Sequence, residues 1–352
     1  MSSDYGNPLT LGDLHDEFLA YFYLQYTGLK NTIMNITVII PTYRRQKDLV
    51  RCLEALQKQT RSPDEVLVVA RDTDIETWEL LEAFNLDLLP LRTVMVSVPG
   101  VVVAMNTGVD VAQGDIIAFT DDDAAPHIDW LARIETHFLS DDCVGGVGGR
   151  DWMYEGTQLV DGASQVVGQL QWFGRVIGEH HLGIGEPREV DVLKGVNMSY
   201  RRTAIADLRF DERMRGTGAQ VHFEIAFSLR LKRARWKLIY DPMVAVDHYR
   251  GQRFDEDQRH QFNDIAFTNM VHNETLALLE HLPPARRVVF LMWSVLVGTR
   301  DGLGFIQWLR FLPREGALAG QKWLASLRGR WQGWLTWQQS HKPKGILGLG
   351  NG

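Results

Sequence analysis

The chain has 352 residues, of which 45% are hydrophobic and 23% are charged. This composition is typical of a folded protein with a sizeable core, and it excludes a disordered chain. The net charge of −7 argues against a general nucleic-acid-binding protein, so no nucleic-acid partner is expected. The two cysteines lack the Cys-x-x-Cys spacing of a zinc site and fit a reducing compartment.

The N-terminal segment carries none of the signals of secretion. Residues 1–16 contain no lysine or arginine, and aspartates stand where a signal peptide has its positive charges. Residues 18–29 are rich in apolar and aromatic side chains, but they are fewer than the roughly 20 that span a bilayer. We therefore expect residues 1–33 to form a largely helical extension that packs on the body of the protein.

The next part of the chain alternates between short β-branched runs and stretches of helical periodicity. Strands are expected at residues 36–40, 65–69, 93–98, 116–119 and 236–240. One helix is expected after Thr42, which can serve as its N-cap, and another over residues 101–112. The glycine-rich residues 145–190 are expected to form a strand followed by irregular loops. Strands alternating with helices predict an α/β fold with a mostly parallel, doubly wound sheet, in which ligands bind beyond the carboxyl ends of the strands.

Three aspartates, Asp121, Asp122 and Asp123, directly follow the strand expected at residues 116–119. Carboxylates placed after a buried strand are unfavourable unless a cation joins them. Asp121 and Asp123 are two residues apart, so a turn can direct both at one point, and a hard divalent cation such as Mg²⁺ or Mn²⁺ is the natural partner. The alternative is a solvated acidic loop that caps the next helix, and these residues alone do not decide between the two.

The C-terminal region combines positive charge with tryptophan. Residues 286–344 hold ten lysines and arginines against two acidic residues, a net charge of +8, together with six of the eleven tryptophans. Such a combination suits the interface of an anionic membrane. The apolar run at residues 288–297 is too short to span a bilayer. Surface-lying helices are therefore expected over residues 255–340, followed by a flexible tail over 341–352. An ordinary buried helix with a solvated basic face is the alternative.

Several motifs in order resemble glycosyltransferase family 2. They are VIIPTYRR (38–45), AMNTG (104–108), AQGDIIAF (112–119), TDDD (120–123), WL (130–131) and GVNMSYRR (195–202). Their order and spacing across residues 36–250 are far more specific than any single motif. The resemblance implies a GT-A fold for residues 34–254, which is one α/β domain with a nucleotide-binding half and an acceptor-binding half.

The resemblance also implies an inverting reaction, in which a base takes the proton of an acceptor hydroxyl as its oxygen attacks the anomeric carbon of a nucleotide sugar. The family usually supplies this base as the second residue of a Glu-Asp pair, a few residues before a Leu-x-x-Arg-Leu pattern. That position falls on Glu224 in HFEIAFSLRL (222–231), and glutamate can make the same proton transfer. His222 is the substitute candidate. Alternatively, Glu224 faces solvent or pairs with a helix cation such as Arg230.

On the same resemblance, the donor nucleotide lies beside the first strand. The residues expected to contact it there are Pro41, Thr42, Tyr43 and Arg45. After its second strand the family usually has an aspartate that reads the nucleobase, whereas this chain has Ala70, Arg71 and Asp72 in that stretch. Either Arg71 or the displaced Asp72 is therefore expected to take that role.

Later motifs add further expected contacts to the donor. These residues are Asn106, Asp121, Asp122, Gly195 and Asn197. Asn106 either bonds the ribose or sugar or pins a turn, and both alternatives stay open. His248 matches a histidine that often follows the last core strand of the family, and it is expected to join Asp121 and Asp123 as a metal ligand.

Together these features predict a metal-dependent, inverting glycosyltransferase that uses Mn²⁺ or Mg²⁺. It would move a hexose or N-acetylhexosamine from a nucleotide-sugar donor to a lipid-linked or polysaccharide acceptor, at the cytoplasmic face of an anionic membrane. A Q-x-x-R-W motif is missing from the sequence, which predicts one sugar per encounter and not processive synthesis. Two alternatives stay open: a sugar nucleotidyltransferase, and a non-catalytic membrane-surface binding protein on the same scaffold.

Overall fold

The computed structural model describes residues 33–84, 88–258 and 261–341. The helix expected within residues 1–33 and nearly all of the expected tail therefore lie outside the described residues. The chain divides into two compact units, Met1–Met34 and Asn35–Gly352, and every element named below belongs to the second.

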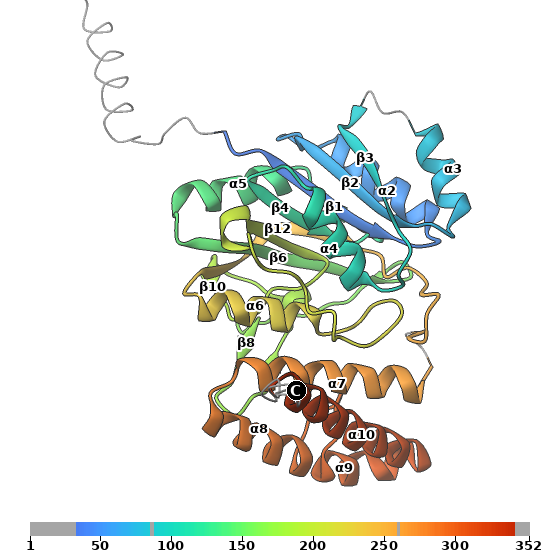
Figure 1. Ribbon diagram of the computed structural model, residues 1–352, viewed down its shortest axis with the longest axis vertical. Helices are drawn as coiled ribbons and strands as arrows, with labels where there is room; N and C mark the ends of the chain where they lie inside the picture. Colours follow the sequence, from blue (N-terminus) through green and yellow to red (C-terminus); the bar gives the residue numbers. More distant parts are fainter. Residues whose placement is uncertain (1–32, 85–87, 259–260, 342–352) are drawn as a thin grey trace, which may run out of the picture. The chain divides into compact units, whose positions relative to one another are not determined.

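A ten-stranded sheet forms the centre of this unit, in the order β10-β12-β6-β11-β4-β1-β2-β3, with β5 beside β12 and β7 beside β6 (Figure 1). One half consists of four parallel strands: β1 (Ile36–Thr42), β2 (Glu65–Arg71), β3 (Leu91–Val96) and β4 (Ile116–Thr120). The other half contains β6 (Val144–Glu155), β10 (Arg188–Glu189), β11 (Asn197–Arg201) and β12 (Lys237–His248). β11 runs antiparallel to both β4 and β6, whereas β12 is parallel to β6. The largely parallel α/β sheet predicted from the sequence is thus present.

The central strands β1 and β4 are nearly continuous apolar runs, buried along their whole length because both faces of the sheet are covered there. The helices along this part of the chain are α2 (Gln46–Gln57), α3 (Ile75–Ala83), α4 (Val101–Val111), α5 (Trp130–Ser140) and α6 (Phe223–Arg233). Side chains of α4 and α6 join one main core with those of the strands, as Met105 and Phe227 do with Phe119 and Tyr200. Gly108 allows α4 to lie close to β1, because a Cβ there would stand 2.7 Å from Cγ2 of Ile39.

The start of α2 differs from the prediction. β1 runs through Pro41 and ends at Thr42, and the helix begins only at Gln46, with Arg45 in the N-cap position. Thr42 is therefore not the N-cap. Its hydroxyl instead donates a hydrogen bond of 2.7 Å to Oδ2 of Asp122, a contact between residues 80 positions apart.

Short elements complete the region after β4. They are β5 (Ala124–Pro126), β7 (Gln158–Leu159), β8 (Gln169–Leu170), β9 (Val176–Ile177), and the 3₁₀ turns η2 (His180–Leu182) and η3 (Arg202–Ala204). β8 and β9 form an antiparallel hairpin outside the main sheet. The single strand followed by irregular loops expected after residue 145 is therefore present as β6 and the segment that follows it.

The C-terminal part is helical, as expected. It consists of α7 (Asp264–His281), α8 (Pro284–Leu296), α9 (Phe305–Glu315) and α10 (Ala317–Ser340), which gather in one layer (Figure 1). α7 packs against α6 on the sheet side and against α10 within the layer. Among the described residues, no helix is both long and apolar enough to cross a membrane.

Candidate active site

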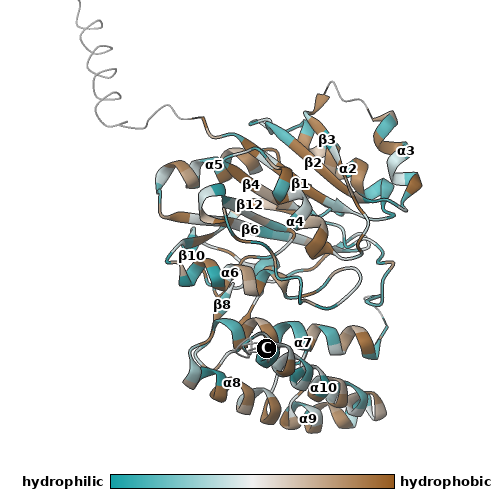
Figure 2. Ribbon diagram, viewed as in Figure 1, coloured by the Kyte–Doolittle hydropathy of each residue, from teal (hydrophilic) through white to brown (hydrophobic). Residues whose placement is uncertain are grey.

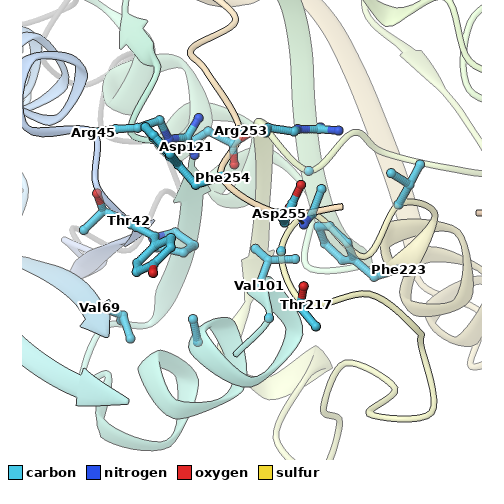
Figure 3. Close-up of a pocket in the computed structure, with 18 of the residues that line it drawn as sticks. Thr42, Arg45, Val69, Val101, Asp121, Thr217, Phe223, Arg253, Phe254 and Asp255 are labelled. Carbon is cyan, nitrogen blue, oxygen red and sulfur yellow. Dashed lines mark hydrogen bonds between the residues drawn. The ribbon is translucent and has the colours of Figure 1, made fainter. Parts of the chain in front are cut away.

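A pocket of about 340 Å³ lies at the carboxyl ends of the parallel strands, where the sheet topology predicts ligand binding. We call it the strand-end pocket. Nine of the predicted site residues line it: Pro41, Thr42, Tyr43, Arg45, Arg71, Asp121, Gly195, Glu224 and His248. Figure 3 shows Thr42, Arg45 and Asp121 toward one side of the pocket, with Thr217 and Phe223 toward the other.

A cation and an aromatic ring lie together in the strand-end pocket. The guanidinium of Arg71 lies 4.1 Å from the centroid of the Tyr43 ring, and it donates a hydrogen bond of 3.3 Å to the carbonyl of Thr217. Both side chains line the strand-end pocket, whereas Asp72 does not. Of the two candidates for the base-reading position, Arg71 lines this pocket and Asp72 does not, and the assignment of that role stays a prediction.

The three consecutive aspartates have different surroundings. Asp122 has no exposed surface; its carboxylate accepts the Thr42 hydrogen bond and pairs with Nη2 of Arg45 at 2.8 Å. Nη1 of the same arginine lies 2.8 Å from Oδ2 of Asp123. Arg45 therefore fixes two of the carboxylates in place. Asp122 holds the loop from within and, like Asp123, does not line the pocket, so its donor contact stays a prediction.

The other two aspartates form a cluster with a histidine. Ligand atoms of Asp121, Asp123 and His248 all lie within 4.8 Å of one another. Nδ1 of His248 lies 3.3 Å from Oδ2 of the buried Asp151, and Nε2 lies 3.5 Å from Oδ1 of Asp123. A proton on Nδ1, held by the Asp151 carboxylate, leaves the Nε2 lone pair directed at the cluster. Two carboxylates and one neutral imidazole are suitable ligands for Mn²⁺ or Mg²⁺.

Two residues of this network were not predicted. Asp151 is buried in β6, and Nζ of Lys194 lies 2.5 Å from its Oδ2. Although burial opposes ionisation, Lys194 and the His248 hydrogen bond hold the pKa of Asp151 well below its ordinary value. Asp151 is therefore a fixed negative charge behind His248. Lys194 also lines the strand-end pocket. It directly precedes the GVNMSYRR motif, and this position was the only sequence signal that could have drawn attention to it.

Glu224 stands in the first turn of α6, where the partial positive charge of a helix N-terminus favours a carboxylate. The backbone before it is strained: Gln220 and His222 have φ angles of +41° and +77°. Burial raises the pKa of Glu224 from its ordinary value, with a contribution from Asp121, while His222 and Lys194 act in the opposite direction. A raised pKa brings a carboxylate closer to the range in which it serves as a general base.

Two residues predicted to contact the donor have side chains that form hydrogen bonds inside the fold, and their donor contacts stay predictions. Asn106 accepts a hydrogen bond of 2.8 Å from the amide of Phe210 and returns one of 3.0 Å to its carbonyl. It therefore pins a turn, one of the two alternatives that were open. Asn197 accepts from Nε1 of Trp130 at 2.9 Å and donates to the carbonyl of Val244 at 2.7 Å. Neither asparagine lines the strand-end pocket.

Gly195 does line this pocket, and it also has a packing role. A Cβ at this position would stand 2.8 Å from Cζ of Phe223, the first residue of α6. The glycine therefore allows the chain to pass close to the turn that carries Glu224.

Comparison with known proteins agrees with this geometry. Residues 37–209 match the sequence model of glycosyl transferase family 2. Glycosyltransferase AglE of Haloferax volcanii is 35% identical over 112 residues, covering 30% of this chain and 36% of AglE. The glucosyl-dolichyl phosphate glucuronosyltransferase of the same organism is 23% identical over 226 residues, covering 61% of this chain and 69% of that protein. The chain thus spans little more than a third of AglE.

One solved structure extends the likeness to nearly the whole chain. The mannosyltransferase PcManGT from Pyrobaculum calidifontis, in complex with GDP-Man and Mn²⁺, superposes with a TM-score of 0.53 at 15% identity. The match covers 94% of this chain and 96% of PcManGT. At this identity the likeness concerns the fold. The motifs, the sheet and the family match together identify residues 37–209 as a glycosyl transferase family 2 segment in a chain that has a GT-A fold.

Proposed function

We propose that this protein is an inverting, metal-dependent glycosyltransferase that moves a sugar from a nucleotide-sugar donor to a lipid-linked or polysaccharide acceptor. One observation carries the proposal. Asp121 and His248 of the candidate metal cluster line the strand-end pocket together with Glu224, a glutamate whose pKa is raised, and Asp123 completes the cluster beside them. A transfer of this kind needs a group that binds the departing diphosphate and a group that removes the acceptor proton.

Asp121, Asp123 and His248 would hold the cation. A bound divalent cation supplies Lewis-acid stabilisation of the negative charge that develops on a leaving diphosphate. Arg45 keeps Asp123 oriented, because its guanidinium pairs with Oδ2 and leaves Oδ1 of the same carboxylate facing the cluster. The pair of Tyr43 and Arg71 offers an aromatic face and a cation to the nucleobase.

Glu224 would act as the base. In its ionised form it accepts the proton of an acceptor hydroxyl, which makes that oxygen a better nucleophile at the anomeric carbon. Inversion follows from a single displacement on the face opposite the diphosphate. Lys194 connects the two parts of the site, because its ammonium pairs with Asp151 behind His248 and also lowers the pKa of Glu224.

We place the reaction at the cytoplasmic face of a membrane, to which the protein binds peripherally. α9 has no buried residue, and hydrophobic residues recur along α8 and α9 (Figure 2), where their exposed side chains form an apolar surface. Its exposed apolar side chains are Val288, Met292, Val295, Leu296, Phe305, Ile306, Leu309 and Leu312. Exposed arginines of α9 stand beside this surface, at positions 310 and 314. Apolar side chains next to cations favour the surface of an anionic bilayer.

The predicted tryptophan belt is only partly available to this surface. Trp308 and Trp323 stack on each other with centroids 4.7 Å apart, and Trp334 and Trp337 pack against the main core. Trp331 is 59% exposed. Support for a lipid-linked acceptor comes from the apolar surface and from one relative, whose name states action on a glucosyl-dolichyl phosphate.

A donor screen tests the proposed activity. The purified protein is incubated with a panel of UDP-, GDP- and other nucleotide sugars, Mn²⁺ and a detergent extract of membrane lipids, and release of nucleoside diphosphate is measured. EDTA should abolish the release, and added Mn²⁺ should restore it. Asp121→Asn should abolish it, whereas the control Asp110→Asn, at an exposed ion pair with Arg209, should not. If no donor is turned over or bound, the protein is a non-catalytic binding protein on this fold.

The network behind the metal cluster gives a second test. Asp151→Asn removes the charge that orients His248, so Mn²⁺ affinity should fall by about 10–100-fold, as is typical for partners of metal ligands. Manganese binding can be measured by electron paramagnetic resonance in the presence of nucleoside diphosphate. Unchanged affinity would show that the charge of Asp151 does not support metal binding through His248.

A further inference from the structure

A second cavity, of about 420 Å³, adjoins the strand-end pocket. Lys194 and Glu224 line both of them, so the two spaces meet at the proposed base. A glutamate that removes a proton from an acceptor must face the donor pocket and the acceptor together. This shared lining makes the second cavity the candidate for the acceptor.

The helical C-terminal region supplies one wall of this cavity. The wall is formed by Met270 and Glu274 of α7 and by the turn between α8 and α9, which contains Arg300 and Asp301. The family match ends at residue 209, so these residues lie outside the segment that the family model describes. The facing wall comes from β9 with the residue before it, Arg175, and from η2.

The chemistry of the walls suits a sugar. Hydroxyl groups both donate and accept hydrogen bonds, and the cavity offers carboxylates from Glu274 and Asp301 together with the cations Arg175 and Arg300. Ile177, with Ile225, Met270 and Val271, adds apolar contact for the C–H face of a sugar ring. Pockets of this size with a few fixed polar groups are typical of small-molecule sites.

Two contacts hold the walls in position. Glu274 pairs at 2.6 Å with Arg330 of α10, a buried arginine that also donates to the hydroxyl of Thr275 at 3.0 Å. On the facing side, Arg286 of α8 donates hydrogen bonds to the carbonyls of Trp172 and Gln171 at the tip of the hairpin. The cavity is thus built between elements that are themselves tied to the C-terminal helices.

The surroundings of the cavity are apolar. The α8–α9 turn is preceded by Leu296 and followed by Phe305, which are 53% and 44% exposed. The hairpin tip carries Trp172, which is 66% exposed, and its neighbour Phe173 packs against Trp293 of α8 at 4.9 Å. Apolar side chains thus stand next to the α8–α9 turn and next to the hairpin, two segments of the chain that line the cavity.

We propose that the second cavity binds the sugar head of an amphiphilic, lipid-linked acceptor and presents its hydroxyl to Glu224, with the hydrocarbon part lying along the flanking apolar side chains. The C-terminal helices are then part of the active site as well as a membrane contact. This inference rests on the proposed glycosyltransferase function and names its acceptor class.

The test uses methyl and octyl glycosides of glucose, galactose and N-acetylglucosamine as probes, with the full-length protein. Binding is measured by saturation-transfer NMR with nucleoside diphosphate and Mn²⁺ present, and transfer is measured as the KM for the glycoside. Arg300→Ala removes an exposed cation of the cavity wall, and Ile177→Trp fills the cavity. The matched control is Arg328→Ala, an exposed arginine of α10 that pairs with Asp264 and does not line the cavity.

Both wall variants should weaken glycoside binding at least 10-fold and raise its KM, while the Kd for the nucleotide donor and the behaviour of the control stay unchanged. At least one octyl glycoside should bind 10-fold more tightly than its methyl counterpart. Unchanged glycoside binding in both variants would overturn the cavity assignment. Equal affinity for octyl and methyl probes would overturn the lipid-linked class in favour of a polysaccharide. Arg300-dependent binding without turnover of any donor would instead refute the proposed activity alone.

Discussion

Replacing Glu224 by glutamine tests the proposed base with little disturbance of the fold. Glutamine keeps the size of the side chain and its hydrogen-bonding capacity, but it cannot accept a proton. Among the described residues no ion pair involves Glu224, so the substitution breaks no salt bridge. Because burial raises the pKa of Glu224, its ionised form is less favourable in the folded chain than in the unfolded chain. The melting temperature of Glu224→Gln at neutral pH should therefore equal or exceed that of the wild type.

The expected loss of activity follows from the role of a general base, which contributes about 10²–10⁴-fold to a rate. At about 1.36 kcal/mol for each factor of ten, this is about 3–5 kcal/mol of transition-state stabilisation. The loss should appear in kcat, because the nucleotide end of the strand-end pocket is left intact. The Kd for the nucleotide donor should therefore change less than about 3-fold, well below the loss in rate.

The assay combines release of nucleoside diphosphate under saturating donor with calorimetric donor binding and a thermal melt. Glu189→Gln is the matched control, since this exposed glutamate of β10 pairs with Lys232 and lines neither cavity. A Glu224→Gln protein that keeps full activity would show that the base is another group, and His222 would be tested next. A fall in donor affinity that matches the loss in rate would assign Glu224 to binding.

Three further predictions concern the site and its support. Lys194→Met removes a cation that lowers the pKa of Glu224, so this pKa should rise. In a plot of log kcat/KM against pH, the acid limb, on which the base becomes protonated, should therefore move to higher pH. An unmoved limb would mean that it does not report Glu224. Asn106→Ala should lower the free energy of unfolding by about 1–3 kcal/mol, because it leaves backbone groups of the turn without their partner, and the donor Kd should stay constant; a weaker donor Kd at unchanged stability would restore its contact with the sugar. Gly108→Ala should cost about 1–3 kcal/mol in urea denaturation because of overpacking against β1, whereas Gly320→Ala in α10, with nothing within 4 Å of the new Cβ, should be neutral or stabilising by up to about 1 kcal/mol.

Local patterns were sufficient to predict the parallel half of the sheet and the position of the aspartates. A β-branched run such as residues 36–40 is typical of a strand in a sheet that is covered on both faces. Residues that directly follow β4 must lie at the carboxyl edge of that sheet. The position of Asp121 at the strand-end pocket could therefore be predicted without any information about contacts between distant residues.

Contacts between distant residues account for what the sequence could not predict. Asn106 is paired with Phe210, 104 positions away, and Thr42 with Asp122, 80 positions away. A polar side chain beside a binding motif is equally suited to a ligand or to a buried backbone group, and only the tertiary fold decides which of them it meets. The role of Asp151 was not predicted for the same reason, because its partners Lys194 and His248 come from other segments of the chain.

The C-terminal helices cannot be separated cleanly from the catalytic domain. α7 packs on α6, whose first turn carries Glu224, and its own Glu274 lines the second cavity through a buried pair with Arg330 of α10. A truncation before α8 would remove the apolar surface of α8 and α9, but it would also leave Glu274 without Arg330. Loss of membrane binding and loss of acceptor recognition would then occur together and could not be assigned. Single substitutions resolve the two roles, since Leu309→Glu alters only the exposed surface of α9, whereas Arg300→Ala alters the cavity wall.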